Sequence, residues 1–282
     1  FYLQRGDTAQ AEKVLHDAIA VAPDNHDLKL NLAGFFLLQK QIDKAREIYT
    51  GLLEQDDVTI LKAKTRLAYL ANLEGKVDEA LVTLDEVLKE NPADVEALKL
   101  RGGINIARNK PQDAINDLRA VASATPDSPD VLKMLGRAHL QNKENQQAID
   151  LYKAALNLQP ADAELRLQLA DVYAAMGEAN EAAKQLETAN KIVPNNPVIL
   201  EKMVRIYIDS QYLDDAENTL KSLQALAPQS PRNAYYQGLV YQARNQHQQA
   251  LAEFDKSIAL KAGATEPMTA KVKSYIALKK LD

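Results

Sequence analysis

Small and large apolar residues alternate with polar ones along this chain in a pattern that returns about every 34 residues. Aligning the chain on a small residue gives eight alanines spaced 34, 35, 34, 34, 34, 34 and 34 residues apart: Ala11, Ala45, Ala80, Ala114, Ala148, Ala182, Ala216 and Ala250. A large apolar or aromatic residue follows each of them by four positions: Leu15, Tyr49, Leu84, Leu118, Tyr152, Leu186, Leu220 and Phe254. Because residues four apart share one face of an α-helix, this pattern predicts a helix at the same phase of every repeat.

In most repeats another helix is predicted on the N-terminal side of this one, so that it is the first helix of the repeat. Twelve residues before seven of the alanines stands another residue that is small in six cases: Ala33, Ala68, Gly102, Gly136, Ala170, Val204 and Gly238. In the later repeats a tyrosine follows three positions on, at Tyr173, Tyr207 and Tyr241. Each repeat is therefore expected to be a pair of helices, and no part of the pattern predicts a strand.

Residues that end and begin helices recur at fixed phases between these helices. Glycine or asparagine, which adopt the left-handed conformation at low cost, stand where the first helix should end: Gly6, Gly75, Asn109, Gly177 and Asn245. Residues that cap helix N-termini precede the next repeat: Asn25, Asp94, Ser128, Asp162, Asn196 and Ser230. Pro129, Pro197 and Pro231 follow three of these caps, in the first helical turn where proline is tolerated.

The combined pattern resembles the tetratricopeptide repeat, in which a small residue, Tyr, Ala, an aromatic residue and Pro recur over 34 residues. The proline phase is filled in six of eight cases, at Pro23, Pro92, Pro126, Pro160, Pro194 and Pro228. The resemblance implies an all-α fold, a right-handed α-α superhelix or solenoid of about eight helix-turn-helix repeats. The expected organisation is a partial repeat at 1–25, complete repeats at 26–60, 61–94, 95–128, 129–162, 163–196, 197–230 and 231–264, and a partial repeat at 265–282. Tyr2 and Tyr275 share the phase of Tyr173, so the chain is expected to be a segment of a longer array.

Composition narrows the functional classes. Apolar residues make up 46% and charged residues 26% of the chain, and no apolar run approaches the roughly 18 to 20 residues that span a bilayer. A net charge of −5 without a long block of one sign gives little support to nucleic-acid binding. The absence of cysteine excludes disulfides and thiolate sites, and it fits either an oxidising or a reducing compartment.

Residues for catalysis or cofactor binding do not form a recognisable set. The four histidines, His16, His26, His139 and His247, have no metal-ligand spacing, and no phosphate-binding, dinucleotide-binding or nucleophile-elbow motif occurs. We interpret Gly102 as a packing residue and the acidic pairs Asp56-Asp57 and Asp214-Asp215 as helix-end residues. The sequence therefore predicts a protein that is not an enzyme and that holds no metal or cofactor.

The resemblance implies a concave groove lined by the second, fifth, ninth and twelfth residues of each repeat. Carrying these phases onto the sequence gives the candidate groove residues Lys62, Tyr69, Lys99, Lys133, Arg137, Glu164, Asp171, Arg205, Arg232 and Tyr235, with Arg66 beside them. The basic members among 62–137 favour an extended partner segment that carries acidic residues, although a solvated charged helix face is an equal alternative. The carboxylate clamp of tetratricopeptide co-chaperones is not expected, because Gly103 and Met134 stand where it has asparagines.

The resemblance implies a protein-protein interaction scaffold. Regular repeats rich in Ala, Gln and Asn, with joints such as "NPADVEAL", are similar to long bacterial tetratricopeptide proteins that serve exopolysaccharide export and other envelope assemblies, which would place the chain in the periplasm or cell envelope. Two alternatives stay open. In the first, the chain is the substrate-recruiting region of a larger enzyme such as a glycosyltransferase. In the second, it self-associates through its open repeat ends.

Overall fold

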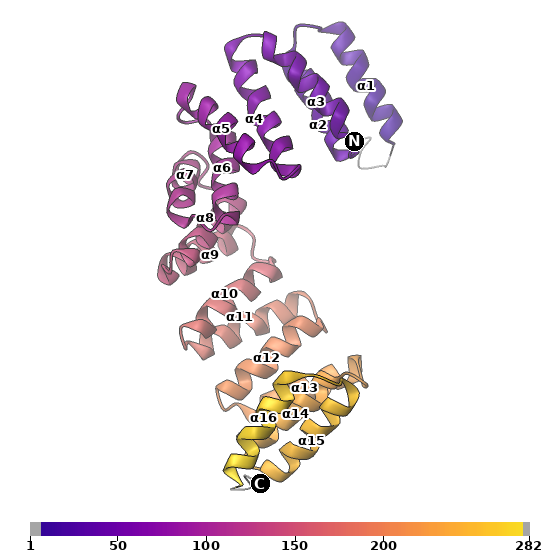
Figure 1. Ribbon diagram of the computed structural model, residues 1–282, viewed down its shortest axis with the longest axis vertical. Helices are drawn as coiled ribbons and strands as arrows, with labels where there is room; N and C mark the ends of the chain where they lie inside the picture. Colours follow the sequence, from indigo (N-terminus) through magenta and orange to yellow (C-terminus); the bar gives the residue numbers. More distant parts are fainter. Residues whose placement is uncertain (1–6, 279–282) are drawn as a thin grey trace. The chain divides into compact units, whose positions relative to one another are not determined.

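The computed structural model describes residues 7–278, and every regular element in this part of the chain is a helix (Figure 1). The chain divides into two compact units, residues 1–144 (unit 1) and 145–282 (unit 2). The predicted all-α fold of repeated helix pairs is thus confirmed. Gly6, Tyr2 and the outer ends of the two predicted partial repeats lie outside the described residues.

Unit 1 contains helices from indigo to magenta in Figure 1. They are α1 (Thr8–Val21), α2 (His26–Leu38), α3 (Ile42–Gly51), the short 3-10 helix η2 (Leu52–Glu54), α4 (Asp57–Leu73), α5 (Val77–Glu90), α6 (Val95–Ala107), α7 (Pro111–Ala124) and α8 (Pro129–Gln141). Unit 2 contains α9 (Asn145–Leu158), α10 (Ala163–Ala175), α11 (Ala179–Ile192), α12 (Pro197–Asp209), α13 (Leu213–Leu226), α14 (Pro231–Ala243), α15 (His247–Leu260) and α16 (Thr265–Ala277).

Consecutive helices pack in pairs, and the first helices of successive pairs also touch one another. In unit 1 the pairs are α2 with α3, α4 with α5 and α6 with α7, while α4 contacts α6 and α6 contacts α8. Unit 2 repeats this arrangement, because α12 contacts α14 and α14 contacts α16. Each pair buries its apolar face only against its neighbours, as in a solenoid. The division between the units falls between α8 and α9, inside the predicted repeat 129–162, and the repeat boundaries themselves stay predictions.

The small residues of the repeat are where helices approach most closely. Ala148 and Ala182 are completely buried, and so are the large side chains four positions later. At Gly102 an added Cβ would lie 2.8 Å from Cγ of Leu118, on the facing helix. Gly102 is therefore a packing residue, as predicted, because any side chain there would displace Leu118.

The turns inside the pairs use left-handed residues more widely than the sequence suggested. Gly75, Gly177, Asn109 and Asn245 have positive φ values of 77°, 79°, 55° and 60°, which confirms the predicted positions. The same phase of the sequence is filled at other turns by Lys40, Lys143 and Gln211, with φ of 59°, 63° and 63°. The turn geometry is thus set by the repeat and is imposed even on residues that do not favour it.

Four of the six predicted caps hold the first turn of a helix through their side chains. Asn25, Asp94, Asp162 and Asn196 each accept a hydrogen bond from a backbone N–H two or three residues on. Ser128 and Ser230 occupy the N-cap position, but neither makes a side-chain cap hydrogen bond, so these two predictions were wrong in that respect. A proline also follows Asn196, which does cap its helix, so the proline does not account for the difference.

Candidate binding groove

The first helices of unit 1 line a groove made of two adjoining hollows. The larger, which we call the α2–α4 hollow, has a volume of about 1160 Å³ and includes Leu30, Gly34 and Leu37 of α2. The smaller, which we call the α4–α6 pocket, has a volume of about 510 Å³. Thr65, Arg66, Tyr69 and Glu96 line both hollows, so that the two form one continuous groove.

The α4–α6 pocket is built from one face of each of its helices. Its lining consists of Thr65, Arg66, Tyr69 and Asn72 from α4, Glu96, Lys99, Leu100, Gly103, Ile104 and Ala107 from α6, and Met134 from α8. Spacings of three and four residues along α4 and α6 bring these side chains to the same side of their helices. Gly103 keeps the floor open, because a Cβ at this position would lie 3.3 Å from Cε of Met134.

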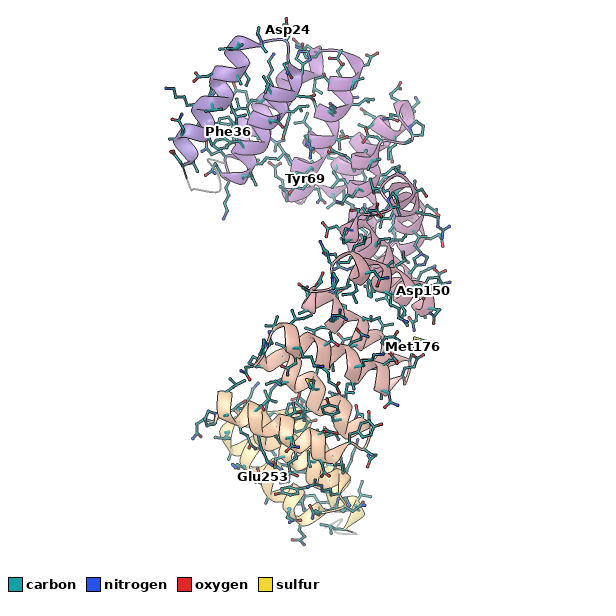
Figure 2. The ribbon with its side chains drawn as sticks, turned by 180° about the vertical axis from the view of Figure 1, so that it is seen from behind. Asp24, Phe36, Tyr69, Asp150, Met176 and Glu253 are labelled. Atoms are coloured by element: carbon teal, nitrogen blue, oxygen red, sulfur yellow. The ribbon has the colours of Figure 1, made fainter. Side chains whose placement is uncertain are left out.

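Tyr69 is the aromatic residue that the groove presents. Its side chain comes from α4 and is 37% exposed although it is large and apolar (Figure 2). It lines both hollows, whereas Phe36 in the same unit is buried. Aromatic residues at such positions are common anchors of protein interfaces.

Two of the predicted groove cations of unit 1 form ion pairs with acidic residues of neighbouring first helices. The ammonium of Lys62 donates a hydrogen bond to Asp27 of α2 at 2.8 Å, and the guanidinium of Arg66 donates to Glu96 of α6 at 2.8 Å. The hydrogen bond to Asp27 raises the pKa of Lys62 above its usual value. These exposed pairs contribute about 0–1 kcal/mol each to stability. Their larger effect is to neutralise the positive charges of Lys62 and Arg66, which the sequence predicted to bind acidic residues of a partner.

The remaining predicted cations of unit 1 differ in their surroundings. Lys133 forms an ion pair with Asp130 at 3.0 Å. Lys99 is half-buried and Arg137 exposed, and neither forms an ion pair with another residue in the described part of the chain. The pKa of Asp130 is lowered mainly by the hydrogen bond from Lys133, with a further contribution from the charge of Lys99. The basic stretch predicted from the sequence is thereby reduced to Lys99 and Arg137.

The predicted groove residues of the second half of the chain lie in unit 2. Asp171 pairs with Lys202, Arg232 pairs with Glu201, and Glu164 and Arg205 are exposed. The pKa of Arg232 is raised above its usual value by the charge of Glu201.

Tyr235 is a packing residue as much as an exposed one. It is half-buried, and its ring centroid lies 5.5 Å from that of Tyr236 and 6.2 Å from that of Phe254. Burial raises the pKa of both tyrosines above the usual value. Tyr236, whose side chain faces the core, leaves Tyr235 as the one of the pair that reaches the surface.

Sequence reasoning did not pair the groove cations with the acidic residues Asp27, Glu96 and Glu201. Each lies about one repeat period from the cation that it binds, at separations of 35, 30 and 31 residues. A search for opposite charges about one period apart would have named them as candidate partners without showing which pairs form.

The described residues also show whether metal-ligating side chains cluster. Between residues 7 and 278 no three His, Asp or Glu side chains are grouped as a metal ion would require. His139 is buried and pairs with Glu144. In the same part of the chain no helix combines the length and apolarity that crossing a bilayer requires.

Comparison with protein families gives matches over most of the chain. Two family models, both described as tetratricopeptide repeat, match residues 2–67, 140–199 and 174–240 in one case and 66–129 and 106–164 in the other. Curated proteins gave no match.

Solved structures share the fold. A crystal structure of MamA is 25% identical, with a TM-score of 0.55, and the match covers 58% of this chain and 90% of that one. A tetratricopeptide repeat protein from Parabacteroides merdae is 15% identical, with a TM-score of 0.57 and coverage of 88% and 98%. YrrB, described as a tetratricopeptide repeat protein with an unusual peptide-binding site, is 16% identical, with a TM-score of 0.55 and coverage of 67% and 97%.

Proposed function

Since this chain belongs to the tetratricopeptide repeat family, we propose that it is a non-catalytic scaffold that binds an extended segment of a partner protein in the groove of unit 1. Proteins built from such repeats generally mediate protein-protein interaction through the extended surfaces that stacked repeats create.

One observation carries the proposal. The α2–α4 hollow and the α4–α6 pocket form a continuous groove along three first helices, and Tyr69 stands exposed where the two meet. A hollow of this extent, lined by both apolar and polar side chains, offers a surface on which a ligand segment can bind. The proposed site residues in unit 1 are Tyr69, Lys99 and Arg137, with Lys62, Arg66 and Lys133 as cations that a partner reaches in competition with their present acidic partners.

The experiment is a selection followed by a titration. A random peptide library displayed on phage is selected on the whole 282-residue chain, and the dissociation constants of the selected peptides are measured by fluorescence anisotropy. Tyr69→Ala is expected to weaken binding by about fivefold or more, because truncation of an interface aromatic removes a buried contact.

Tyr275→Ala is the matched control. Tyr275 is a tyrosine with the same exposed fraction as Tyr69, 37%, and it lies on α16 of unit 2. Its truncation should leave the affinity unchanged. The proposal is wrong if no peptide is selected, or if every selected peptide binds the Tyr69→Ala variant as tightly as the unaltered chain.

On the pathway, we propose that the partner belongs to a bacterial envelope assembly, such as exopolysaccharide export. Support comes from the near-regular repeats and their "NPADVEAL"-type joints. Cross-linking in cells of the source organism, followed by identification of the cross-linked protein, tests this: a partner with no envelope role contradicts it.

A further inference from the structure

The α4–α6 pocket combines an apolar floor with one cation, Lys99, that forms no ion pair within the described part of the chain. Leu100, Ile104, Ala107 and Met134 supply apolar surface, and Gly103 leaves the space above them open. The volume of about 510 Å³ falls within the range of roughly 300–1,000 Å³ in which pockets enclose a compact ligand group. An apolar group that enters this space gains by leaving water.

The charges that line the pocket sum to one positive charge. Arg66 and Glu96 neutralise each other through their hydrogen bond, and Lys99 has no ion-pair partner among residues 7–278. Lys99 is half-buried, so that a carboxylate beside it would be partly shielded from water. An ion pair in such a place is stronger than one on an open surface.

The two remaining polar side chains of the pocket differ in whether they already form a hydrogen bond within the chain. The hydroxyl of Thr65 donates to the carbonyl oxygen of Leu61 in its own helix, so that this donor is not free for a ligand. The amide of Asn72 makes no side-chain hydrogen bond with another described residue, and it can both donate and accept. An extended peptide backbone requires such a group, because it offers unpaired N–H and C=O groups.

From this lining we infer that the α4–α6 pocket holds a bulky apolar side chain of the partner segment while Lys99 binds an Asp or Glu carboxylate of the same segment. The inference rests on the proposed function and adds the chemistry of the partner. A segment that is acidic throughout fits less well, because the α2–α4 hollow has its cations Lys62 and Arg66 already paired.

Two substitutions separate the apolar contact from the ionic one. Gly103→Leu fills the pocket from its floor, where the nearest side-chain atom is the flexible end of Met134. Its control is Gly51→Leu, at an exposed glycine of α3 with helical backbone angles and open space around it. Lys99→Glu reverses the charge, and Lys89→Glu makes the same change at an exposed lysine of α5.

The probes are the phage-selected peptides, each paired with a version in which Asp and Glu are replaced by Asn and Gln. Gly103→Leu should weaken binding about tenfold or more, and Gly51→Leu should not change it. Lys99→Glu should weaken binding of the acidic peptides about fivefold or more and have little effect on their amide versions. Lys89→Glu should have little effect on either. Thermal unfolding of all four variants establishes that they are folded.

The outcomes distinguish this inference from the proposed function. Peptides that depend on Tyr69 but bind the Gly103→Leu or the Lys99→Glu variant at full affinity overturn the inference and leave the proposed function standing. Selected peptides that lack an acidic residue, or that lack a bulky apolar residue, also overturn the inference. If the affinity of every selected peptide is the same for the Tyr69→Ala variant and the unaltered chain, both the inference and the proposed function are wrong.

Discussion

Gly238 and Phe254 meet so closely that a Cβ at residue 238 would lie 2.4 Å from Cε1 of the phenylalanine ring. Phe254 is fully buried, so the ring has no free space into which it can turn. Gly238→Ala should therefore destabilise the chain by about 1–2 kcal/mol, since the overpacking cost exceeds the gain in helix propensity.

Gly34→Ala is the same change where nothing lies within 4 Å of the added Cβ. It should raise stability by up to about 1 kcal/mol through helix propensity alone. Urea unfolding followed by circular dichroism measures both variants, and equal shifts of the two midpoints would contradict the packing explanation.

Asp117 should be the most costly acidic residue to remove among those in ion pairs. Its two carboxylate oxygens accept hydrogen bonds from Nε and Nη2 of Arg101 at 3.0 and 2.7 Å, and its side chain is only 7% exposed. We expect Asp117→Ala to cost about 2–3 kcal/mol, less than for a fully buried pair because Arg101 is 27% exposed.

Asp78→Ala supplies the comparison, because Asp78 pairs with Arg108 while being 90% exposed. Its loss should cost no more than about 1 kcal/mol. Asp78 also lies in the first turn of α5, where an acidic side chain interacts favourably with the helix dipole, and this contribution is part of the loss. Thermal unfolding of the two variants checks the order, and an equal loss would show that burial of the Arg101 pair adds nothing.

Lys40 is a lysine in a conformation that favours glycine. Its φ is 59°, and it is exposed with no ion pair in the described part of the chain. Lys40→Gly should raise stability by about 0.5–1 kcal/mol, because relief of the left-handed strain exceeds the entropy cost of glycine. Lys13→Gly, inside α1, should lower stability by about 1 kcal/mol. Urea midpoints that move in the same direction for both variants would contradict the prediction.

Asp56 should titrate far below an ordinary aspartate. The hydroxyl and backbone N–H of Thr59 donate to its carboxylate at 2.7 and 3.0 Å, and with the hydroxyl bond as the largest cause they lower the pKa of Asp56 from 3.8 to about 2. A lowered pKa stabilises the folded chain above pH 3.8, and this contribution is lost as the pH falls toward about 2.

Thr59→Val removes the hydroxyl and keeps the backbone N–H, so the pKa of Asp56 should rise but stay below its usual value. Carboxyl ¹³C NMR titration measures the change. The lowered pKa of Asp130, which depends mainly on Lys133, serves as the internal control. A variant in which the pKa of Asp56 does not move would assign the shift to other groups.

The sequence was sufficient for the features that depend on the size of a side chain. Ala148, Tyr152 and their counterparts must pack wherever the helices meet, so their spacing predicted the pairs. Lys143 and Gln211 gave no sign of their left-handed backbone, because the geometry comes from the pair and not from those residues. The division into two units left no trace either, since the 34-residue pattern continues through residues 144 and 145.

The sequence could place the side chains of the candidate site on one surface but not pair their charges, and their role in binding stays a prediction. The repeat phases placed Tyr69 and Lys99 on the groove with Arg66 beside them, and all three line the α4–α6 pocket. The sequence could not reveal that Glu96 reaches Arg66. This contact depends on how closely the two first helices approach and on which side-chain rotamers they allow.

In the Arg66–Glu96 pair the positive charge of the Arg66 guanidinium is neutralised by the carboxylate of Glu96. Substituting Glu96 by a neutral residue would release that group at the meeting point of the two hollows without adding a cation to the sequence. Two relatives with the same basic residues can thus prefer different ligands, and their selectivity would diverge by deletion of a carboxylate instead of acquisition of a new contact.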